Sequence, residues 1–219
     1  MALAVIRTQA GTRAACVGVN DAALSRQMGR EGPRLPTVFA KHSEALTGAP
    51  ADILQPAASQ AVDREAELAA VLDTGVRNTG ERPAKAAVTG YLLLADLTAR
   101  DWQSRRLQRR RGKRVEATTP LGTELVTPDE AGTELELPRA VDGETVRQAG
   151  TTGLVSGSAA PVASVSAILT LGPGEMSSLG APGGVGQSRT PPHHLQPGRL
   201  HSTAVALLVG CRHSCVAST

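Results

Sequence analysis

Short apolar stretches separated by turn signals run along most of the chain and favour a β-rich fold. "GYLLLADLT" (residues 90–98) and "STAVALLVG" (202–210) have the length and content of buried strands, and "PDEAG" (128–132) is a typical turn. A helical pattern occurs around residues 21–29 and at "SAAPVASVSAIL" (158–169), whose Pro is suited to a first helical turn. We therefore expect mostly strands with a few short helices.

Residues 62–72, "VDREAELAAVL", are compatible with two different structures. In a strand, alternate side chains share a face, so Asp63, Glu65 and Glu67 would crowd together. In a helix, residues two apart point nearly opposite ways, and the acids would lie on an ordinary solvated surface. Glu, Ala and Leu are strong helix formers, so propensity alone favours the helix. The local pattern leaves both possibilities open.

The composition indicates a globular protein with a thinly filled core. The 219 residues could form one medium domain or two small ones, yet they include only one Trp, one Tyr and one Phe. The formal net charge of +3 is too small for repulsion to favour disorder. We expect low stability as the consequence.

The sequence also favours a cytoplasmic protein with reduced thiols. Arg7 and Arg13 interrupt the apolar N-terminus, which leaves no signal-peptide core, and no apolar run is long enough to span a membrane. The three cysteines, Cys16, Cys211 and Cys215, are too few and odd in number for a disulfide framework.

Three other patterns carry little functional information. "CRHSC" (211–215) has no second ligand pair at a usual zinc spacing. "GGVG" lies in a loop-like segment, residues 180–198, and is too lax for a nucleotide fingerprint. "RRLQRRRGKR" (105–114) has seven basic residues that could bind phosphate, but no interleaved aromatics, so we rank nucleic-acid binding as a distant alternative.

A further carboxylate makes the acidic segment a candidate metal site. Asp96 ends an apolar run 29 residues after Glu67, so two strands could gather Glu65, Glu67 and Asp96. An all-oxygen site suits a hard divalent ion such as Mg²⁺, Mn²⁺ or Ca²⁺. Acids scattered over a surface are the common alternative.

Six segments in one colinear series resemble the fumarylacetoacetate hydrolase family. They are "FAKHSEALTGAPADI", "VDREAELAAVL", "GYLLLADLTARDWQ", "GKRVEATTPLG", "VDGETVRQAGTTGL" and "LGPGEMSSLGAPGGVG". The resemblance implies an α+β, β-rich mixed-sheet fold of the family's C-terminal catalytic domain type, usually paired as a homodimer. It also implies a catalytic domain over residues 16–210, preceded by an N-terminal segment (1–15) and followed by a C-terminal tail (211–219).

The same resemblance implies site residues and a reaction class. Glu65 and Glu67 on one strand face would bind a divalent metal together with Asp96, and Lys113 would sit beside that metal. Arg100 and Gln103 of "TARDWQ" would contact a keto-acid substrate, because a guanidinium fork suits a carboxylate. The family implies cleavage of carbon–carbon bonds in diketo or keto acids of the acylpyruvate or fumarylacetoacetate type, with decarboxylation and isomerisation as related reactions.

The chain departs from the family pattern where a catalytic base is expected. An H-x-x-E pair should follow a G-x-N-Y motif, but in "GVNDAALSRQMG" (18–29) these two positions hold Leu24 and Gln27. Neither side chain accepts a proton near neutral pH. We therefore expect a metal-dependent hydrolase or lyase with impaired catalysis. The alternative is a decayed, non-catalytic relative that binds a metal and a keto acid.

Overall fold

The computed structural model describes most of the chain. The described residues are 14–18, 20, 25–26, 37–48, 51–105, 111–131, 139–141, 144–147, 157–182, 185–198, 200–205 and 208–217. Within these ranges no helix is both long and apolar enough to cross a membrane.

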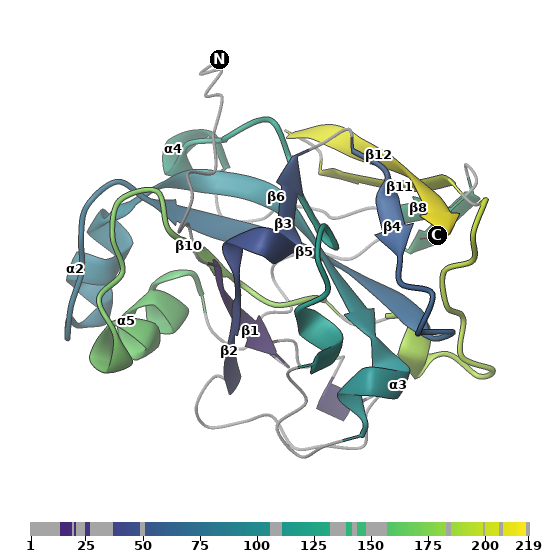
Figure 1. Cartoon of the computed structure of the whole chain (residues 1–219). Coiled ribbons are helices and arrows are strands. Elements are labelled where there is room, and N and C mark those ends of the chain that lie inside the picture. The colour runs from purple at the N-terminus through teal and green to yellow at the C-terminus, as the bar shows by residue number, and fades with distance from the viewer. Residues whose placement is uncertain are drawn as a thin grey trace.

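Two mixed sheets form the framework (Figure 1). The seven-stranded sheet has the order β2-β1-β10-β5-β6-β7-β3, with bounds β2 Thr37–Lys41, β1 Ala14–Gly18, β10 Met176–Ser178, β5 Val62–Leu72, β6 Val88–Ala99, β7 Thr119–Leu121 and β3 Leu46–Gly48. The five-stranded sheet has the order β4-β12-β11-β8-β9, with bounds β4 Ile53–Gln55, β12 Leu208–Ala217, β11 Leu200–Val205, β8 Arg139–Val141 and β9 Glu144–Arg147. The predicted α+β, β-rich mixed-sheet fold is confirmed.

Helices are few and short. They are α2 Glu81–Ala86, α3 Arg100–Gln103, α4 Pro128–Ala131 and α5 Ala159–Ile168, with 3-10 turns η1 Ser43–Ala45, η2 Arg111–Lys113 and η4 Gly186–Ser188. The helix predicted at 158–169 is confirmed as α5, with Pro161 in its first turn. Of the helix predicted at 21–29, only the helical residues Ser25 and Arg26 are described.

The segment 62–72 is a strand, β5, despite its helix propensity. It pairs antiparallel with β6 along its whole length and with β10 on its other edge, and all eleven residues are buried. Pairing on both edges gives the backbone N–H and C=O groups of this strand hydrogen-bond partners, and burial on both faces removes its apolar side chains from water. This tertiary environment outweighs local preference.

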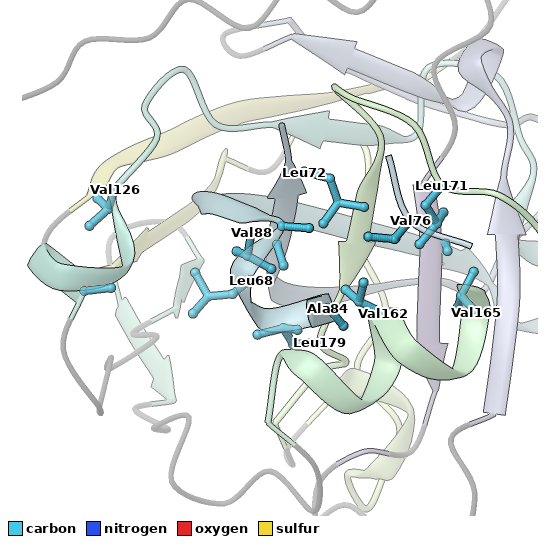
Figure 2. Packing of buried hydrophobic residues seen from close by; sticks show 14 of the residues in the cluster. Leu68, Leu72, Val76, Ala84, Val88, Val126, Val162, Val165, Leu171 and Leu179 are labelled. Atoms are coloured by element: carbon cyan, nitrogen blue, oxygen red, sulfur yellow. The ribbon is translucent and has the colours of Figure 1, made fainter. Parts of the chain in front are cut away.

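The two faces of the β5–β6 pair have different coverings. On one face, Leu68 and Leu72 pack against α2 and α5 through Ala84 and Val162, as Figure 2 shows. Farther along the same face, Val62, Ala95 and Leu97 form a smaller core with Ile53 of β4 and Cys215 of β12. Accordingly, the helices and the second sheet cover opposite ends of one face (Figure 1).

The other face of the β5–β6 pair changes character along its length. At one end Ala69, Val71, Leu92 and Leu94 form an apolar core with β1, β2 and β10. Toward the opposite end the same face carries charged side chains. The apolar part excludes water on one side of these charges, which lowers the local dielectric and strengthens every interaction among them.

The core is built largely from Ala, Leu and Val, so individual large side chains should matter. We expect Leu72→Ala, at a position 1% exposed, to lower the free energy of unfolding by about 2–5 kcal/mol. Ile168→Ala, at an exposed position (71%), should change it by less than about 0.5 kcal/mol. Urea unfolding of both variants checks this, and equal effects would contradict the assignment of the core.

Candidate metal centre

Three carboxylates meet where β5 and β6 face each other. Glu65 and Glu67 share one face of β5, and the strand register places Asp96 of β6 directly opposite Glu65. One ligand oxygen from each residue lies within 4.8 Å of the others, and all three side chains are buried. The candidate ligands that the sequence indicated are thus brought together.

Two lysines neutralise much of this negative charge. Lys113 Nζ, from the turn η2, lies 2.5 Å from Glu65 Oε2 and 2.7 Å from Asp96 Oδ2. Lys41 Nζ, at the end of β2, lies 2.7 Å from Asp96 Oδ1 and donates to Thr119 Oγ1 at 2.6 Å. Both lysines are buried, which such charges tolerate only when they are paired.

Arg100 and Gln103 lie beside the carboxylates on the short helix α3. The Arg100 NH2 group donates to Asp63 Oδ2 at 2.7 Å and to Glu65 Oε1 at 2.5 Å. Its NH1 group donates to Gln103 Oε1 at 2.9 Å. The two predicted substrate contacts therefore form one hydrogen-bonded unit at the edge of the cluster.

Charge balance sets opposite pKa shifts on the two glutamates. Burial alone would raise the pKa of Glu65, but Lys113 and Arg100 outweigh it and lower this pKa to about 2. Burial raises the pKa of Glu67 well above its usual range, and the charges of Asp96 and Glu65 raise it further. Among the described residues, no Lys or Arg forms an ion pair with Glu67, whose carboxylate accepts a hydrogen bond from Ser178 Oγ.

The donor set fits a hard divalent cation. Asp96 Oδ1 is buried with Lys41 Nζ 2.7 Å away as its ion-pair partner. Glu67, which forms no ion pair with a Lys or Arg among the described residues, offers carboxylate oxygen that a divalent cation would satisfy. The nearby Cys16 thiol is buried, and this burial together with Asp96 and Glu67 raises its pKa, which disfavours a thiolate ligand.

Several features of the site carried no clear signal in the sequence. Lys41 is a single lysine at the end of a short strand, and Ser178 is a single serine in "MSSL". Asp63 was grouped with its acidic neighbours, yet it binds Arg100 rather than joining the metal cluster. Only the long-range strand pairing brings these residues together.

Other predicted features have mixed outcomes. Leu24 and Gln27, which replace the expected base pair, lie outside the described residues. In the basic run, Lys113 turns inward to the carboxylates, whereas Arg105 lies over the Trp102 ring at 5.5 Å. Cys215 of "CRHSC" is buried between the two sheets. The expected domain limits of residues 16 and 210 remain predictions.

Comparison with known proteins gives consistent matches over most of the chain. The family model described as "Fumarylacetoacetate (FAA) hydrolase C-terminal" matches residues 13–214. A mitochondrial oxaloacetate tautomerase of Bos taurus is 35% identical over 187 residues, which are 84% of this chain and 60% of that protein. The human counterpart is 34% identical over the same length. The chain thus spans 60% of the length of these curated relatives.

Solved structures share the fold. A fumarylpyruvate hydrolase from Pseudomonas aeruginosa, solved with Mn²⁺ and pyruvate, has a TM-score of 0.83 and 27% identity and covers 95% of this chain and 91% of its own. A 5-carboxymethyl-2-hydroxymuconate delta-isomerase from Mycobacterium smegmatis has a TM-score of 0.83 and 28% identity, covering 96% of this chain and 80% of its own. Similar folds therefore support both hydrolysis and isomerisation.

The raised pKa of Glu67 predicts an unusual pH dependence for protein freed of metal by chelator. The folded state holds this proton more tightly than the unfolded chain, whose Glu pKa is about 4.3. The resulting stabilisation is complete below about pH 4.3 and is lost as pH rises through the folded pKa. Glu67→Gln should remove this loss, so urea unfolding should find the variant more stable than native protein at the alkaline end. If the stability of native protein and of Glu67→Gln changed with pH in parallel, the raised pKa of Glu67 would be contradicted.

Gly112 lets the turn that carries Lys113 pack closely on α3. A Cβ at this position would clash with the Ala99 carbonyl oxygen and lie 2.8 Å from Gln103 Cβ. We expect Gly112→Ala to lower the free energy of unfolding by about 1–3 kcal/mol, as overpacking does. Gly157→Ala, where an added Cβ would meet nothing within 4 Å, is the matched control. Equal melting temperatures for the two variants would show that the turn can move freely.

Proposed function

Because this chain belongs to the fumarylacetoacetate hydrolase family, we propose that it is a divalent-metal-dependent enzyme of small keto acids. The observation that carries the proposal is the buried cluster of Glu65, Glu67 and Asp96, with Lys113 and Arg100 against it. A structural role alone would not require three carboxylates with ligand oxygens within 4.8 Å of one another.

Glu65, Glu67 and Asp96 would hold the ion. When bound, a divalent ion supplies a Lewis acid that polarises the keto group of the substrate. The Pseudomonas aeruginosa relative with Mn²⁺ and pyruvate supports such a pairing of metal and keto acid. Mg²⁺, Mn²⁺ and Ca²⁺ all suit three carboxylates, so the choice among them is an experimental question.

Two cationic residues have distinct roles in the proposal. Lys113 Nζ directs N–H donors to Glu65 and Asp96, and its remaining donor can stabilise negative charge that develops on the keto oxygen. Arg100 and Gln103 supply donors for the substrate carboxylate. The chain's own contribution is therefore to orient the substrate and stabilise the enolate charge.

The reaction type depends on whether an activated water is needed. Cleavage of a carbon–carbon bond by water requires a base, and Leu24 and Gln27 occupy the expected base positions. Keto–enol exchange also needs a group that accepts a proton from carbon, but it needs no attacking water, and the curated relatives are oxaloacetate tautomerases. We infer that hydrolysis of acylpyruvates is weak and that tautomerisation or isomerisation is better retained.

A second candidate is a non-catalytic relative that binds metal and a keto acid. The replacement of the expected His and Glu by Leu24 and Gln27 favours it, since metal binding and orientation do not depend on that pair. A homodimer and a cytoplasmic location remain predictions in either case.

A substrate panel with Mn²⁺ distinguishes these candidates. We expect native protein to accelerate oxaloacetate keto–enol exchange, followed by ultraviolet absorbance, more than it accelerates acylpyruvate hydrolysis. Glu67→Gln should abolish both activities, whereas Glu116→Gln, at an exposed position, should not affect them. Metal-dependent binding without turnover on any substrate would select the non-catalytic relative instead.

Restoring the base pair tests the explanation for weak hydrolysis. Residues three apart on a helix share a face, so Leu24→His with Gln27→Glu could orient a water above the substrate. General-base assistance is worth about a hundred- to ten-thousand-fold in rate, and the double variant should gain part of it. Brisk hydrolysis by the native chain, or a folded, metal-loaded double variant that stays inert, would refute this explanation.

A further inference from the structure

Asp63 lies beside the candidate metal ligands and has an unusually complete set of donors. Its fully buried carboxylate accepts hydrogen bonds at Oδ1 from the backbone N–H groups of Arg64 (2.8 Å) and Gly186 (2.9 Å). At Oδ2 it accepts from Gln187 N (3.0 Å) and from Arg100 Nε (2.9 Å) and NH2 (2.7 Å). One carboxylate thus joins the strand β5, the helix α3 and the turn η4.

These contacts determine which edge of the Arg100 guanidinium remains for a ligand. The Nε and NH2 groups are directed to Asp63 and Glu65, and NH1 donates one hydrogen to Gln103 Oε1. An NH1 group has two hydrogens, so one donor remains there. Within the described ranges, Gln103 Nε2 donates to no acceptor. Arg100 NH1 and Gln103 Nε2, which lie on two hydrogen-bonded side chains, thus retain donors that a carboxylate could accept, and we refer to them as the Arg100–Gln103 donor pair.

The turn η4 is held tightly against Asp63. A Cβ on Gly186 would lie 2.5 Å from Asp63 Oδ1 and would also clash with the His193 carbonyl oxygen. The backbone therefore approaches the carboxylate as closely as glycine allows. A displacement of Asp63 would remove two hydrogen bonds from this turn and two from the guanidinium.

We propose that Asp63 is a positioning residue that orients the Arg100–Gln103 donor pair toward the carboxylate of the substrate and fixes the turn η4 beside it. The part concerning substrate rests on the proposed function, whereas the orientation of Arg100 and η4 does not. Asp63 acts through Arg100 and is distinct from the candidate metal ligands. Its loss should weaken recognition of the carboxylate while metal affinity is retained.

The first experiment needs neither metal nor substrate. Asp63→Asn retains a carbonyl acceptor but loses the charge and presents an amide to Arg100. By NMR, we expect the Arg100 Nε–H and the Gly186 and Gln187 amides to exchange with solvent at least about tenfold faster than in native protein. Asp101→Asn is the control, because the Asp101 carboxylate accepts a hydrogen bond from Ser59 Oγ at 2.6 Å, whereas Arg100 donates to Asp63. We expect native protection of the three N–H groups in this control. If these three N–H groups exchanged as slowly in Asp63→Asn as in native protein, the proposal would be overturned.

The second experiment measures ligand preference on Mn²⁺-loaded protein. Pyruvate carries a carboxylate and pyruvamide a neutral amide in its place. We expect Asp63→Asn to bind pyruvate about tenfold more weakly, with pyruvamide binding and Mn²⁺ affinity changed by less than about threefold. Equal losses for both ligands would indicate general damage and overturn the positioning role. If native protein binds neither Mn²⁺ nor pyruvate, the proposed function fails, and the exchange experiment still decides the role of Asp63.

A second variant covers the case in which Asp63→Asn does not fold. Arg100→Lys keeps a positive charge for Asp63 but lacks the planar fork. We expect it to lose the preference for pyruvate over pyruvamide while the Gly186 and Gln187 amides remain protected, because Asp63 holds them. Exposure of these amides in Arg100→Lys, or an unchanged pyruvate preference, would contradict the proposal.

Discussion

Mutual neutralisation of buried charges is the constraint on which this fold depends. Four carboxylates lie on one face of the β5–β6 pair, and three cationic side chains meet them. Removing an isolated charge from water costs several kcal/mol, so Asp63, Glu65 and Asp96 each pair with a cation. Burial instead raises the pKa of Glu67, which favours its neutral form. The partners come from β2, α3 and η2, and β2 lies far from the other two in the sequence. The ion pairs therefore bind three peripheral elements to the β5–β6 pair.

Much of the fold could be predicted from the sequence, but the decisive strand could not be predicted from local pattern. Alternating acids in "VDREAELAAVL" fit a strand, whereas its Glu, Ala and Leu content favours a helix. The choice is made by pairing with β6 and β10, which is long-range information. The family resemblance implies a strand here, and the structure agrees with it. The helix α5 could be predicted directly, because its Pro is suited to a first helical turn.

The cations of the site show where sequence reasoning reaches its limit. Lys113 lies in a basic run of seven Lys and Arg residues, and only the family resemblance distinguishes it from its neighbours. Lys41 had no signal at all, because one lysine in a short strand has no periodicity to interpret. This chain has the metal ligands that the family resemblance implies but lacks the catalytic base that it implies. The carboxylates are gathered and buried, while the expected base positions hold Leu24 and Gln27. Binding and turnover can therefore differ widely.

Calorimetric titration of the purified protein with Mn²⁺ tests the central claim most directly, because it reports folding and the carboxylate cluster in one measurement. The account predicts saturable binding of one ion per chain, weakened at least about tenfold in Glu67→Gln and unchanged in Glu116→Gln. Absence of saturable binding to folded native protein, or equal affinity in native protein and Glu67→Gln, would contradict it.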